Sequence, residues 1–580
     1  MIPHHTKIIS LVDGAKQFKI PIYQRTYDWD EDHWSQLWSD VIRAGRSEQD
    51  RHFLGTIVYK AEGTTGAGEI QKYLVVDGQQ RLTTVILLAV AMIRHAKRDP
   101  SGPLSSKIQA VERQLVINDN KDRGERHKLV LTKNDRETLA SIIDSRQAPD
   151  DASDRIQDAF EYFEGMIERE DDDELVLAGI SKLSFIDIAL EDMDDPQQIF
   201  ERTNSTGRKL SPTDLIRNFV FMRMDDEQQR ALYEDHWSPM EEILRHRENV
   251  WYLDQFVRDY LTAHRGNIPD KDEVYEVFID HVRDRRIEDI VADMAKMSRL
   301  YSHLLFPDTG PEETREVVEN IRRLRSDVAY PFMLRVYSGL HGNVLDIGDV
   351  QRIFRMVESY LFRRWMCGMT SGPLNKIFAT MSHWSLGTGY AEDLANRLAD
   401  LEGTGAFPSD DKFRSEFKYK QAYKNQRVLK YMLERIENHG YDGTARVVID
   451  DSITIEHIMP RSLSAEWRAN LGPDWPNIHK DYLHTVGNLT IVSKRSNPSI
   501  GNATFKKKRD GPEGYKKSKF HLNAELSRYE EWTADEIIDR ADALSKRAVK
   551  IWPYPVERDA LTERRRAGSG SLDEYDEEDA

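Results

Sequence analysis

The sequence predicts a multidomain α+β protein, with short strands in both end regions and a mostly helical region between them. Its 580 residues are enough for roughly two to four domains of ordinary size. Hydrophobic residues make up 39% of the chain and aromatic residues 9%, which is sufficient for packed cores. Short β-branched runs near both ends, and an apolar periodicity of 3.6 residues in the middle, predict the order of these regions.

The N-terminal region contains three candidate strands. Phe53–Tyr59 (FLGTIVY) and Tyr73–Val76 (YLVV) are short, β-branched and aromatic. Between them, the Gly- and Thr-rich stretch Ala61–Glu69 predicts a hairpin loop. The apolar run that begins at Val85 continues as a helix, and Leu183–Leu190 is a further strand candidate.

The middle of the chain is predicted to be mostly helical. Ser211 is a candidate N-cap and Pro212 a favourable first helical residue, and segments such as Val350–Trp365 repeat apolar residues at helical spacing. Short strands return around Ile453 and Leu489–Val492, and a last helix is expected at Ala534–Trp552.

These patterns predict four parts. They are an N-terminal module (1–225), a helical connecting region (226–435), a C-terminal module (436–560) and a disordered acidic tail (561–580) that contains GSGS. No internal repeat is evident.

Composition excludes several classes of protein. No apolar run approaches the ~20 residues that span a bilayer, and the first ten residues lack the basic-then-apolar layout of a secretory signal. The single cysteine, Cys367, excludes an intrachain disulfide and a multi-cysteine zinc site. We therefore expect a cytoplasmic microbial protein without a membrane partner.

The net charge of −18 argues against a general polyanion binder, but the charge is uneven. A basic strip near the C-terminus suggests local contact with a phosphate backbone. A solvated lysine-rich helix face is the alternative explanation. The candidate DNA-binding residues are Lys494, Arg495, Lys506, Lys507, Lys508 and Arg509.

The segment ITIEHIMP, Ile453–Pro460, places a carboxylate beside a histidine at a strand end. Hydrolysis of a phosphodiester needs a base to activate water, a metal to neutralise developing charge and a group to hold the base. His457 can be the base, and Glu456, on the opposite side of an extended chain, can bind the metal. Asn488 can brace the loop that carries the base, and Asn497 can complete an oxygen-rich magnesium site.

These elements resemble the ββα-metal, or HNH, nuclease motif: E/D-H-I-x-P, then G-N-L, then a second asparagine nine residues after the first. The resemblance implies that Glu456 and Asn497 bind metal, that His457 is the general base and that Asn488 is structural. Two departures stand out, because Asp is usual where Glu456 stands and the stretch from His457 to Asn488 is longer than in minimal motifs. Asn502 is a rival metal ligand. The alternative is a surface histidine with turn asparagines.

Three polar blocks mark the N-terminal region: Ile20–Trp34, Val75–Thr84 and Phe200–Asn218. None is a Walker P-loop. The second block is predicted to run from a strand through a turn into a helix, whose free amides favour an anion. Arg81 could hold phosphate, and Asp77 could bind magnesium. Gln79 or Gln80 could orient an attacking water, and the third block could close over a ligand. A helix cap and core aromatics are the alternative explanation.

Together the blocks resemble the N-terminal module of the GmrSD family of modification-dependent (type IV) restriction enzymes, whose second half is an HNH domain. The matching blocks here are Tyr23-Gln24-Arg25, Asp77–Arg81 and Phe200–Ser211, with Asp214 following. The resemblance implies a ParB/sulfiredoxin-like N-terminal fold that binds and hydrolyses a nucleoside triphosphate (GTP, ATP or another), with relatives in BREX and Ssp phage-defence systems. The implied nucleotide-binding residues are Tyr23, Gln24, Arg25, Asp77, Gly78, Arg81, Asn204 and Gly207, and the implied NTPase residues are Arg81, Gln79 and Gln80.

The sequence-based hypothesis is therefore an NTP-regulated endonuclease, dependent on Mg²⁺ or Mn²⁺, that cleaves or nicks modified or foreign phage DNA. One alternative is an NTP-switched DNA-modification sensor with an inactive HNH site, and another is an RNA-directed toxin. A homodimer is compatible with the sequence. The DNA modification, the preferred nucleotide and the number of strands cut stay open.

Overall fold

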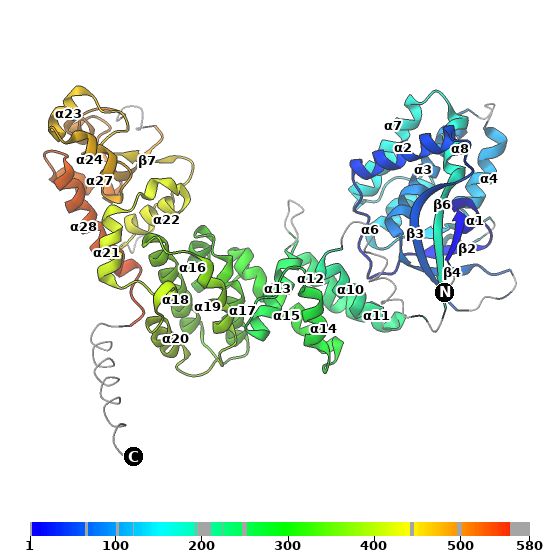
Figure 1. The fold of residues 1–580 in the computed structure, drawn as a ribbon, viewed down its shortest axis with the longest axis horizontal. Coiled ribbons are helices and arrows are strands. Elements are labelled where there is room, and N and C mark those ends of the chain that lie inside the picture. The colour runs from blue at the N-terminus through cyan, green and yellow to red at the C-terminus, as the bar shows by residue number, and fades with distance from the viewer. Residues whose placement is uncertain are drawn as a thin grey trace, which may run out of the picture. The chain divides into compact units, whose positions relative to one another are not determined.

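The computed structural model describes residues 3–63, 66, 68–99, 104–119, 121–191, 194, 210–222, 224–245, 252–440, 446–495 and 501–556. The chain divides into two compact units (Figure 1). The first comprises residues 1–242 and 272–292, and the second comprises residues 243–271 and 293–580. None of the described helices is both long and apolar enough to cross a membrane.

The first unit is built on a six-stranded mixed sheet with the strand order β1-β6-β3-β4-β2-β5. The β1–β6, β3–β4 pairs are antiparallel, whereas β3–β6, β2–β4 and β2–β5 are parallel. The predicted hairpin and the third predicted strand are confirmed, because β3 and β4 pair across a loop and β6 covers Leu183–Leu190. The strands are β1 (Pro3–Lys7), β2 (Lys16–Lys19), β3 (His52–Ala61), β4 (Gln71–Asp77), β5 (Leu129–Val130) and β6 (Leu183–Leu190).

Helices cover both faces of this sheet. One face carries Phe18, Ile57, Tyr59, Val75 and Phe185, which pack against a helical layer that includes α2, α3, α7 and α8 (Figure 1). Residues from Leu82 to Ile93 of α3 are almost all buried, so the apolar run from Val85 forms the centre of this core. The helices between β1 and β6 in sequence are α1 (Ile8–Val12), α2 (Glu31–Arg46), α3 (Gln79–Arg98), α4 (Ser105–Leu115), α5 (Arg123–Arg126), α6 (Lys133–Ile143), α7 (Asp154–Arg169) and α8 (Asp173–Lys182).

The opposite face of the sheet is covered by α10 (Pro212–Phe221). Ser211 caps this helix by accepting a hydrogen bond from the backbone N–H of Asp214 at 3.2 Å, as the Ser-Pro pair predicts. Leu215 of α10 packs against Val58 and Val76 of the sheet. The unit continues with α11 (Asp226–Leu232), a π-helical turn (Tyr233–Trp237), α12 (Ser238–Ile243) and α14 (Val274–Val282).

The second unit begins with the predicted helical region. Its long helix α18 spans Ile347–Met366 and contains the segment that the apolar periodicity predicted. The helices are α13 (Leu253–Arg265), α15 (Ile287–Leu305), which crosses the division between the units, α16 (Glu312–Arg323), α17 (Tyr330–His341), α18, α19 (Gly372–Ser382), α20 (Tyr390–Ala399), α21 (Asp410–Tyr419) and α22 (Gln426–Glu437).

The C-terminal part contains an antiparallel pair, β7 and β8, as predicted. Its core also includes Phe362 of α18, Phe413 of α21 and Leu433 of α22, together with Leu544 of α28. The helical region and the strand pair therefore share one core across the predicted boundary at 435/436. The elements are β7 (Ile453–His457), α23 (Ala465–Leu471), α24 (Trp475–Tyr482), a 3₁₀ turn (Val486–Asn488), β8 (Leu489–Ser493), α26 (Phe505–Asp510), α27 (His521–Ala524) and α28 (Ala534–Ile551). The predicted tail, 561–580, lies outside the described residues.

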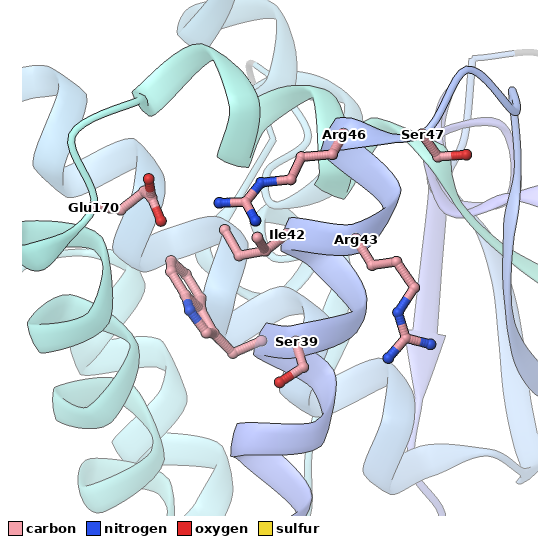
Figure 2. Close-up of a pocket in the computed structure, with 7 residues that line it drawn as sticks. Ser39, Ile42, Arg43, Arg46, Ser47 and Glu170 are labelled. Atoms are coloured by element: carbon pink, nitrogen blue, oxygen red, sulfur yellow. The ribbon is translucent and has the colours of Figure 1, made fainter.

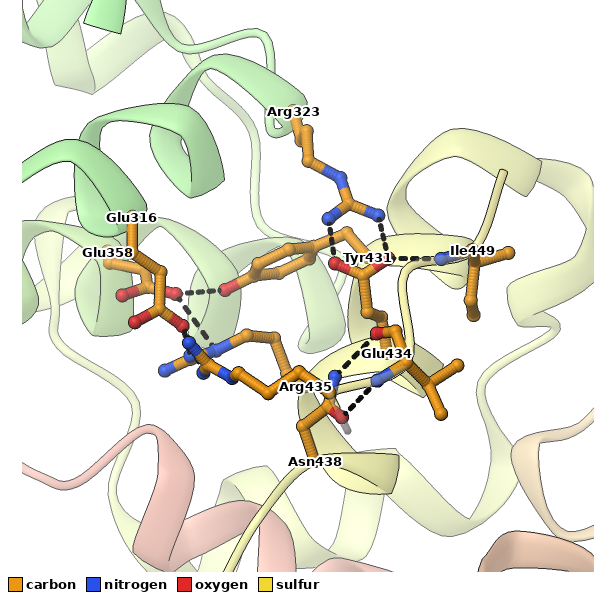
Figure 3. Close-up of polar contacts among 10 residues, drawn as sticks. Glu316, Arg323, Glu358, Tyr431, Glu434, Arg435, Asn438 and Ile449 are labelled. Carbon is orange, nitrogen blue, oxygen red and sulfur yellow. Dashed lines mark hydrogen bonds and ion pairs between the residues drawn. The ribbon is translucent and has the colours of Figure 1, made fainter. Parts of the chain in front are cut away.

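A polar network holds the segment that leads into β7, which includes Val447 and Ile449 (Figure 3). Arg323 of α16 pairs with Glu434 of α22, and Glu434 also accepts the backbone N–H of Ile449 at 2.7 Å. Asn438 holds both the N–H and the C=O of Val447, at 2.8 and 2.7 Å. The helices thus determine where β7 begins.

Candidate functional site

The C-terminal site is built on the β7–β8 pair. Glu456 is opposite Thr490 and His457 is opposite Leu489 in the register of the two strands. Successive side chains of a strand point to opposite faces, so Glu456 and His457 enter different environments. Both are buried, with 8% and 6% of their surface exposed.

Asn488, which is fully buried, braces this site. Its Oδ1 accepts the backbone N–H of Met459 at 2.7 Å and the indole N–H of Trp532 at 3.1 Å. Its Nδ2 donates to the carbonyls of Met459 and Leu483, at 3.0 and 2.9 Å. The amide therefore uses all its main hydrogen-bonding groups to join the segment after His457 to the segment before β8, which is the position that the sequence predicted for it.

His457 lies against a second histidine that the motif did not single out. Its Nε2 is 3.0 Å from Nδ1 of His484. The ring of Tyr423 contacts both imidazoles, with centroid distances of 4.5 Å to His457 and 5.3 Å to His484. Arg461 lies over the same tyrosine ring. Burial, with Arg461 and His484 nearby, lowers the pKa of His457 to about 3, so this imidazole is neutral at pH 7 and can accept a proton.

Glu456 makes a buried ion pair. Nζ of Lys508 is 2.6 Å from Oε1 of Glu456 and donates to the carbonyl of His457 at 2.8 Å. The Lys508 side chain has no exposed surface. Burial raises the pKa of Glu456 and lowers the pKa of Lys508, while the attraction between the two groups opposes both shifts.

Two members of the predicted DNA-binding strip are therefore corrected. Lys508 faces the interior, and Arg509 is 4% exposed, with its guanidinium bound to the carbonyl of Tyr529 and to Asp510. The four consecutive cations of KKKR look equivalent in the sequence. On a helix, however, successive side chains point in different directions, so some of the four face the interior. The other four, Lys494, Arg495, Lys506 and Lys507, are exposed.

The exposed lysines of α26 border an open hollow of about 670 Å³. Lys506 and Lys507 line it together with Asp510 and Glu513, so its charge is mixed.

The predicted metal ligands are only partly described. Asn497 lies outside the described residues, whereas Asn502 is exposed, two residues before the N-cap of α26. Within the described ranges, no three His, Cys, Asp or Glu side chains form a group that could hold a metal ion. Glu456 therefore belongs to no such group, and its Oε1 already binds Lys508.

The N-terminal site forms where parallel strands β2 and β4 end at the same edge of the sheet. Phe18 of β2 is opposite Tyr73 of β4, so the loop after β2 and the turn after β4 emerge together. That brings Tyr23-Gln24-Arg25 beside Asp77–Arg81, although the two blocks are about fifty residues apart in sequence. Gly78 has a φ of 91°, and a Cβ there would lie 2.8 Å from the carbonyl oxygen of Thr56, so the turn requires glycine.

Two predicted ligand-binding glutamines hold the loop instead. Gln24 is buried and its Nε2 donates to the carbonyls of Val75 and Val76, at 2.8 and 3.0 Å. Gln80 is also buried; its Oε1 accepts the N–H of Asp28 at 2.9 Å and its Nε2 donates to the carbonyl of Thr26 at 3.2 Å. Both amide groups of Gln80 thus already bond the backbone of the loop, whereas Gln79, the other residue predicted to orient a water, is half-buried and makes no such bond to the described loop residues.

Charged groups gather at the turn itself. The guanidinium of Arg81 donates to the carbonyl of Thr56 at 2.5 Å and packs against Gly55. Burial raises the pKa of Asp77, while Arg81 and Arg25 oppose that rise. Arg25 lies 3.4 Å from Asp28. Two carboxylates, of Asp28 and Asp77, and two arginines thus lie near the N-terminus of α3, the end of a helix that favours anions.

The third block is only partly described. Asn204 and Gly207 lie outside the described residues. Asp214 pairs with Arg217 at 2.5 Å, and Arg217 also binds Glu241 at 2.7 Å, so Asp214 belongs to a buried ion network. Tyr23 stacks on Phe221 of α10 at a centroid distance of 6.0 Å, which joins the first block to the helix after the third.

Two family models match the chain. The model described as "GmrSD restriction endonuclease, N-terminal domain" matches residues 8–221, and the model described as "GmrSD restriction endonucleases, C-terminal domain" matches residues 407–547. The chain belongs to the GmrSD restriction endonuclease family. A search of curated proteins found no matching relative. The family resemblance inferred from sequence is confirmed, and the C-terminal match covers β7, β8 and the helices α21 and α22 that share their core.

The GmrSD N-terminal domain also carries an open hollow of about 650 Å³ at the end of α2 (Figure 2). Ile42, Arg43 and Arg46 of α2 line it, and Glu170 faces Ile42 and Arg46 from a neighbouring segment. None of the three motif blocks contributes to this hollow.

In this GmrSD chain, sequence analysis missed Tyr423, His484 and Arg461 as residues of the site. It also missed that Lys508 points into the interior. His484 begins the segment HTVGNLTIV that was already singled out, so its nearness to the GNL motif was the available sign. Tyr423 lies too far away in sequence for any local pattern to indicate it.

Proposed function

We propose that this GmrSD-family protein is an NTP-regulated, divalent-metal-dependent DNA endonuclease that restricts modified or foreign phage DNA. The observation that carries the nuclease part is His457: a neutral, buried imidazole beside a carboxylate, at the end of a strand pair whose following helix presents lysines. His457 would accept a proton from the attacking water, and Asn488 would keep its loop in place. The strand pair β7–β8 followed by α26 supports a ββα-metal (HNH) arrangement.

The metal part of the proposal rests on Glu456. Mg²⁺ or Mn²⁺ bound there would neutralise charge that develops on the phosphate. Because Lys508 already binds Oε1, a metal would compete with it for the carboxylate. Asn497 and Asn502 are the proposed further ligands. If Asn497 is the ligand, Asn497→Ala should raise the metal concentration required for half-maximal cleavage more than Asn502→Ala does, and the reverse order would transfer the role to Asn502.

The N-terminal module is proposed to bind and hydrolyse a nucleoside triphosphate. Arg25, Asp77 and Arg81, with the amides at the start of α3, form the charged group that supports this role, and a ParB/sulfiredoxin-like fold is part of the proposal. Arg81 and Arg25 would hold phosphate, Asp77 would bind magnesium, and Gln79 would orient water.

An NTP-switched sensor with an inactive nuclease site is the second candidate. The Glu456–Lys508 ion pair favours it, because the pair already neutralises the proposed metal-binding carboxylate.

A digestion panel tests both candidates. Unmodified, cytosine-modified, glucosylated hydroxymethylcytosine and phosphorothioate DNAs would each be incubated with Mg²⁺ or Mn²⁺, with and without each NTP, using His457→Ala as the control. Metal-dependent cutting or nicking that the control lacks supports the endonuclease. Binding of modified DNA without cutting under every condition supports the sensor and contradicts the endonuclease.

A further inference from the structure

The second histidine at the C-terminal site has a defined relation to the proposed base. Nδ1 of His484 lies 3.0 Å from Nε2 of His457, which is hydrogen-bonding distance. Two neutral imidazoles at this distance share one proton, because one nitrogen must donate and the other accept. The pairing therefore couples the tautomers of the two rings: when His457 carries hydrogen on Nε2, Nδ1 of His484 must accept it.

The backbone on both sides of His484 is held. Before it, the carbonyl of Leu483 accepts from Asn488 at 2.9 Å. After it, Thr485 forms an antiparallel bridge with Gln421, and Gln421 also donates to the carbonyl of Asp481 at 2.7 Å. Since Asn488 also binds both backbone groups of Met459, one side chain fixes the segments that carry both histidines.

The surroundings keep the His484 ring neutral and restrict its orientation. Burial, then Arg461 and His479, lower its pKa, so the ring is neutral near pH 7. Tyr423 stacks on the ring with an interplanar angle of 16°, which restricts its rotation. Nδ1 of His457 makes no hydrogen bond to any described residue, so this nitrogen is available to a water.

We propose that His484 is a positioning residue: its Nδ1 accepts the Nε2 proton of His457, so that the lone pair of His457 lies on Nδ1 as the base of phosphodiester hydrolysis. This inference rests on the proposed nuclease function. His484 acts through His457 and does not touch substrate in this scheme. A base histidine held in the wrong tautomer loses most of its activity even when its position is unchanged.

Substitution of His484 by Asn or by Gln distinguishes the hydrogen bond at Nδ1 from other effects of changing this residue. Asn places an amide oxygen where Nδ1 of His484 lies, whereas Gln places it one bond farther, near the position of Nε2. His484→Asn should therefore cleave within about threefold of wild type. His484→Gln and His484→Leu should lose about 10–100-fold in single-turnover rate, a typical effect of removing the partner that orients a functional imidazole. Melting temperatures of the three variants identify any loss of fold.

The tautomer itself can be measured without cleavage. In the full chain labelled with ¹⁵N-histidine, the two ring-nitrogen shifts of His457, assigned by their loss in His457→Gln, should show hydrogen on Nε2. In folded His484→Leu the two shifts should move toward each other as both tautomers become populated. Hydrogen on Nδ1 in the wild type, or equal rates for the folded Asn and Gln variants, would overturn the proposal. Absence of cleavage by the wild type would instead contradict the proposed function, while the shifts would still test the pair.

Discussion

The two candidate sites use their motif residues in different ways. At the N-terminal turn, the amide of Gln24 hydrogen-bonds the backbone of β4 and the amide of Gln80 hydrogen-bonds the loop after β2. The groups proposed to bind a ligand there are charged: Arg25, Asp77 and Arg81. At the C-terminal site, Asn488 and Lys508 bind backbone groups around the site, and no described residue hydrogen-bonds Nδ1 of His457. A motif shows that polar residues belong together, but hydrogen bonding decides which of them support the site and which face a ligand.

Of the substitutions that distinguish the two sites, His457→Ala should have the largest effect. His457→Ala should reduce DNA cleavage by about 10²–10⁴-fold, because the proposed general base is lost. NTP turnover should stay unchanged, since the N-terminal turn contains none of the residues of this site. Plasmid nicking and NTP hydrolysis, measured on one preparation, check both. Cleavage at the wild-type rate would show that another group activates water.

The buried ion pair should have the next largest effect, on stability. Lys508→Met leaves Glu456 buried without a cation and should lower the free energy of unfolding by about 3–5 kcal/mol. The neighbouring exposed lysine provides a matched control, because Lys507→Met should change stability by less than about 0.5 kcal/mol. Urea unfolding measures both. Adding Glu456→Gln to Lys508→Met should restore part of the loss; equal behaviour of the two lysine variants would mean that Lys508 is not buried as described.

At the N-terminal site, substitution of the charged groups should weaken nucleotide binding, whereas substitution of the buried side-chain amides should lower stability. Arg81→Ala should weaken NTP binding about 10–100-fold, since a hydrogen bond to a charged group contributes about 1.5–3 kcal/mol. Turnover should fall, while cleavage should change only in its response to nucleotide. Isothermal titration and NTPase assays provide the measurements.

Gln80→Leu is the matched control for Arg81→Ala. It should lower the melting temperature through the loss of two loop hydrogen bonds, yet keep normal turnover per folded molecule. If Arg81→Ala instead lowers only the melting temperature, its role is to bind Thr56.

The smallest effect should come from the exposed lysines. Lys506→Ala and Lys507→Ala should each weaken DNA binding uniformly across sequences and reduce the slope of log affinity against log salt by about 1, as the loss of one phosphate contact does. Fluorescence anisotropy over a salt series measures the slope. An unchanged slope in both variants would place the DNA-binding surface elsewhere.

Much of this molecule could be predicted from local patterns. The hairpin of β3 and β4, the strands β6, β7 and β8, and the cap of α10 follow from periodicity, turn composition and the Ser-Pro pair. The predicted position of Asn488 agrees with its contacts, since the GNL motif directly precedes a strand. Local patterns are informative there because each of these features is encoded within a few neighbouring residues.

The remainder depends on contacts between distant segments. Lys508 looks like its neighbours in sequence, and only the packing of α26 against β7 turns it toward Glu456. Tyr423, in the 3₁₀ turn before α22, contacts the two histidines from a distant part of the sequence. Gln80, which the sequence predicted to act on a ligand, hydrogen-bonds the loop after β2. Such roles are set by tertiary geometry, which residue type and spacing do not encode.

Because Asn488 binds the backbone at Met459 and Leu483, it also affects which part of this protein can vary in sequence. The chain that leaves the site after Met459 and returns at Leu483 forms α23 and α24, and their Trp467 and Leu471 pack in a core that also contains Phe505 of α26 and Trp532. Because Asn488 holds both ends of this excursion, the exposed loop between α23 and α24 can change in length or sequence without displacing the two histidines. This loop is therefore a natural place for evolution, or for a protein engineer, to graft a new DNA-contacting surface next to an unchanged reaction centre.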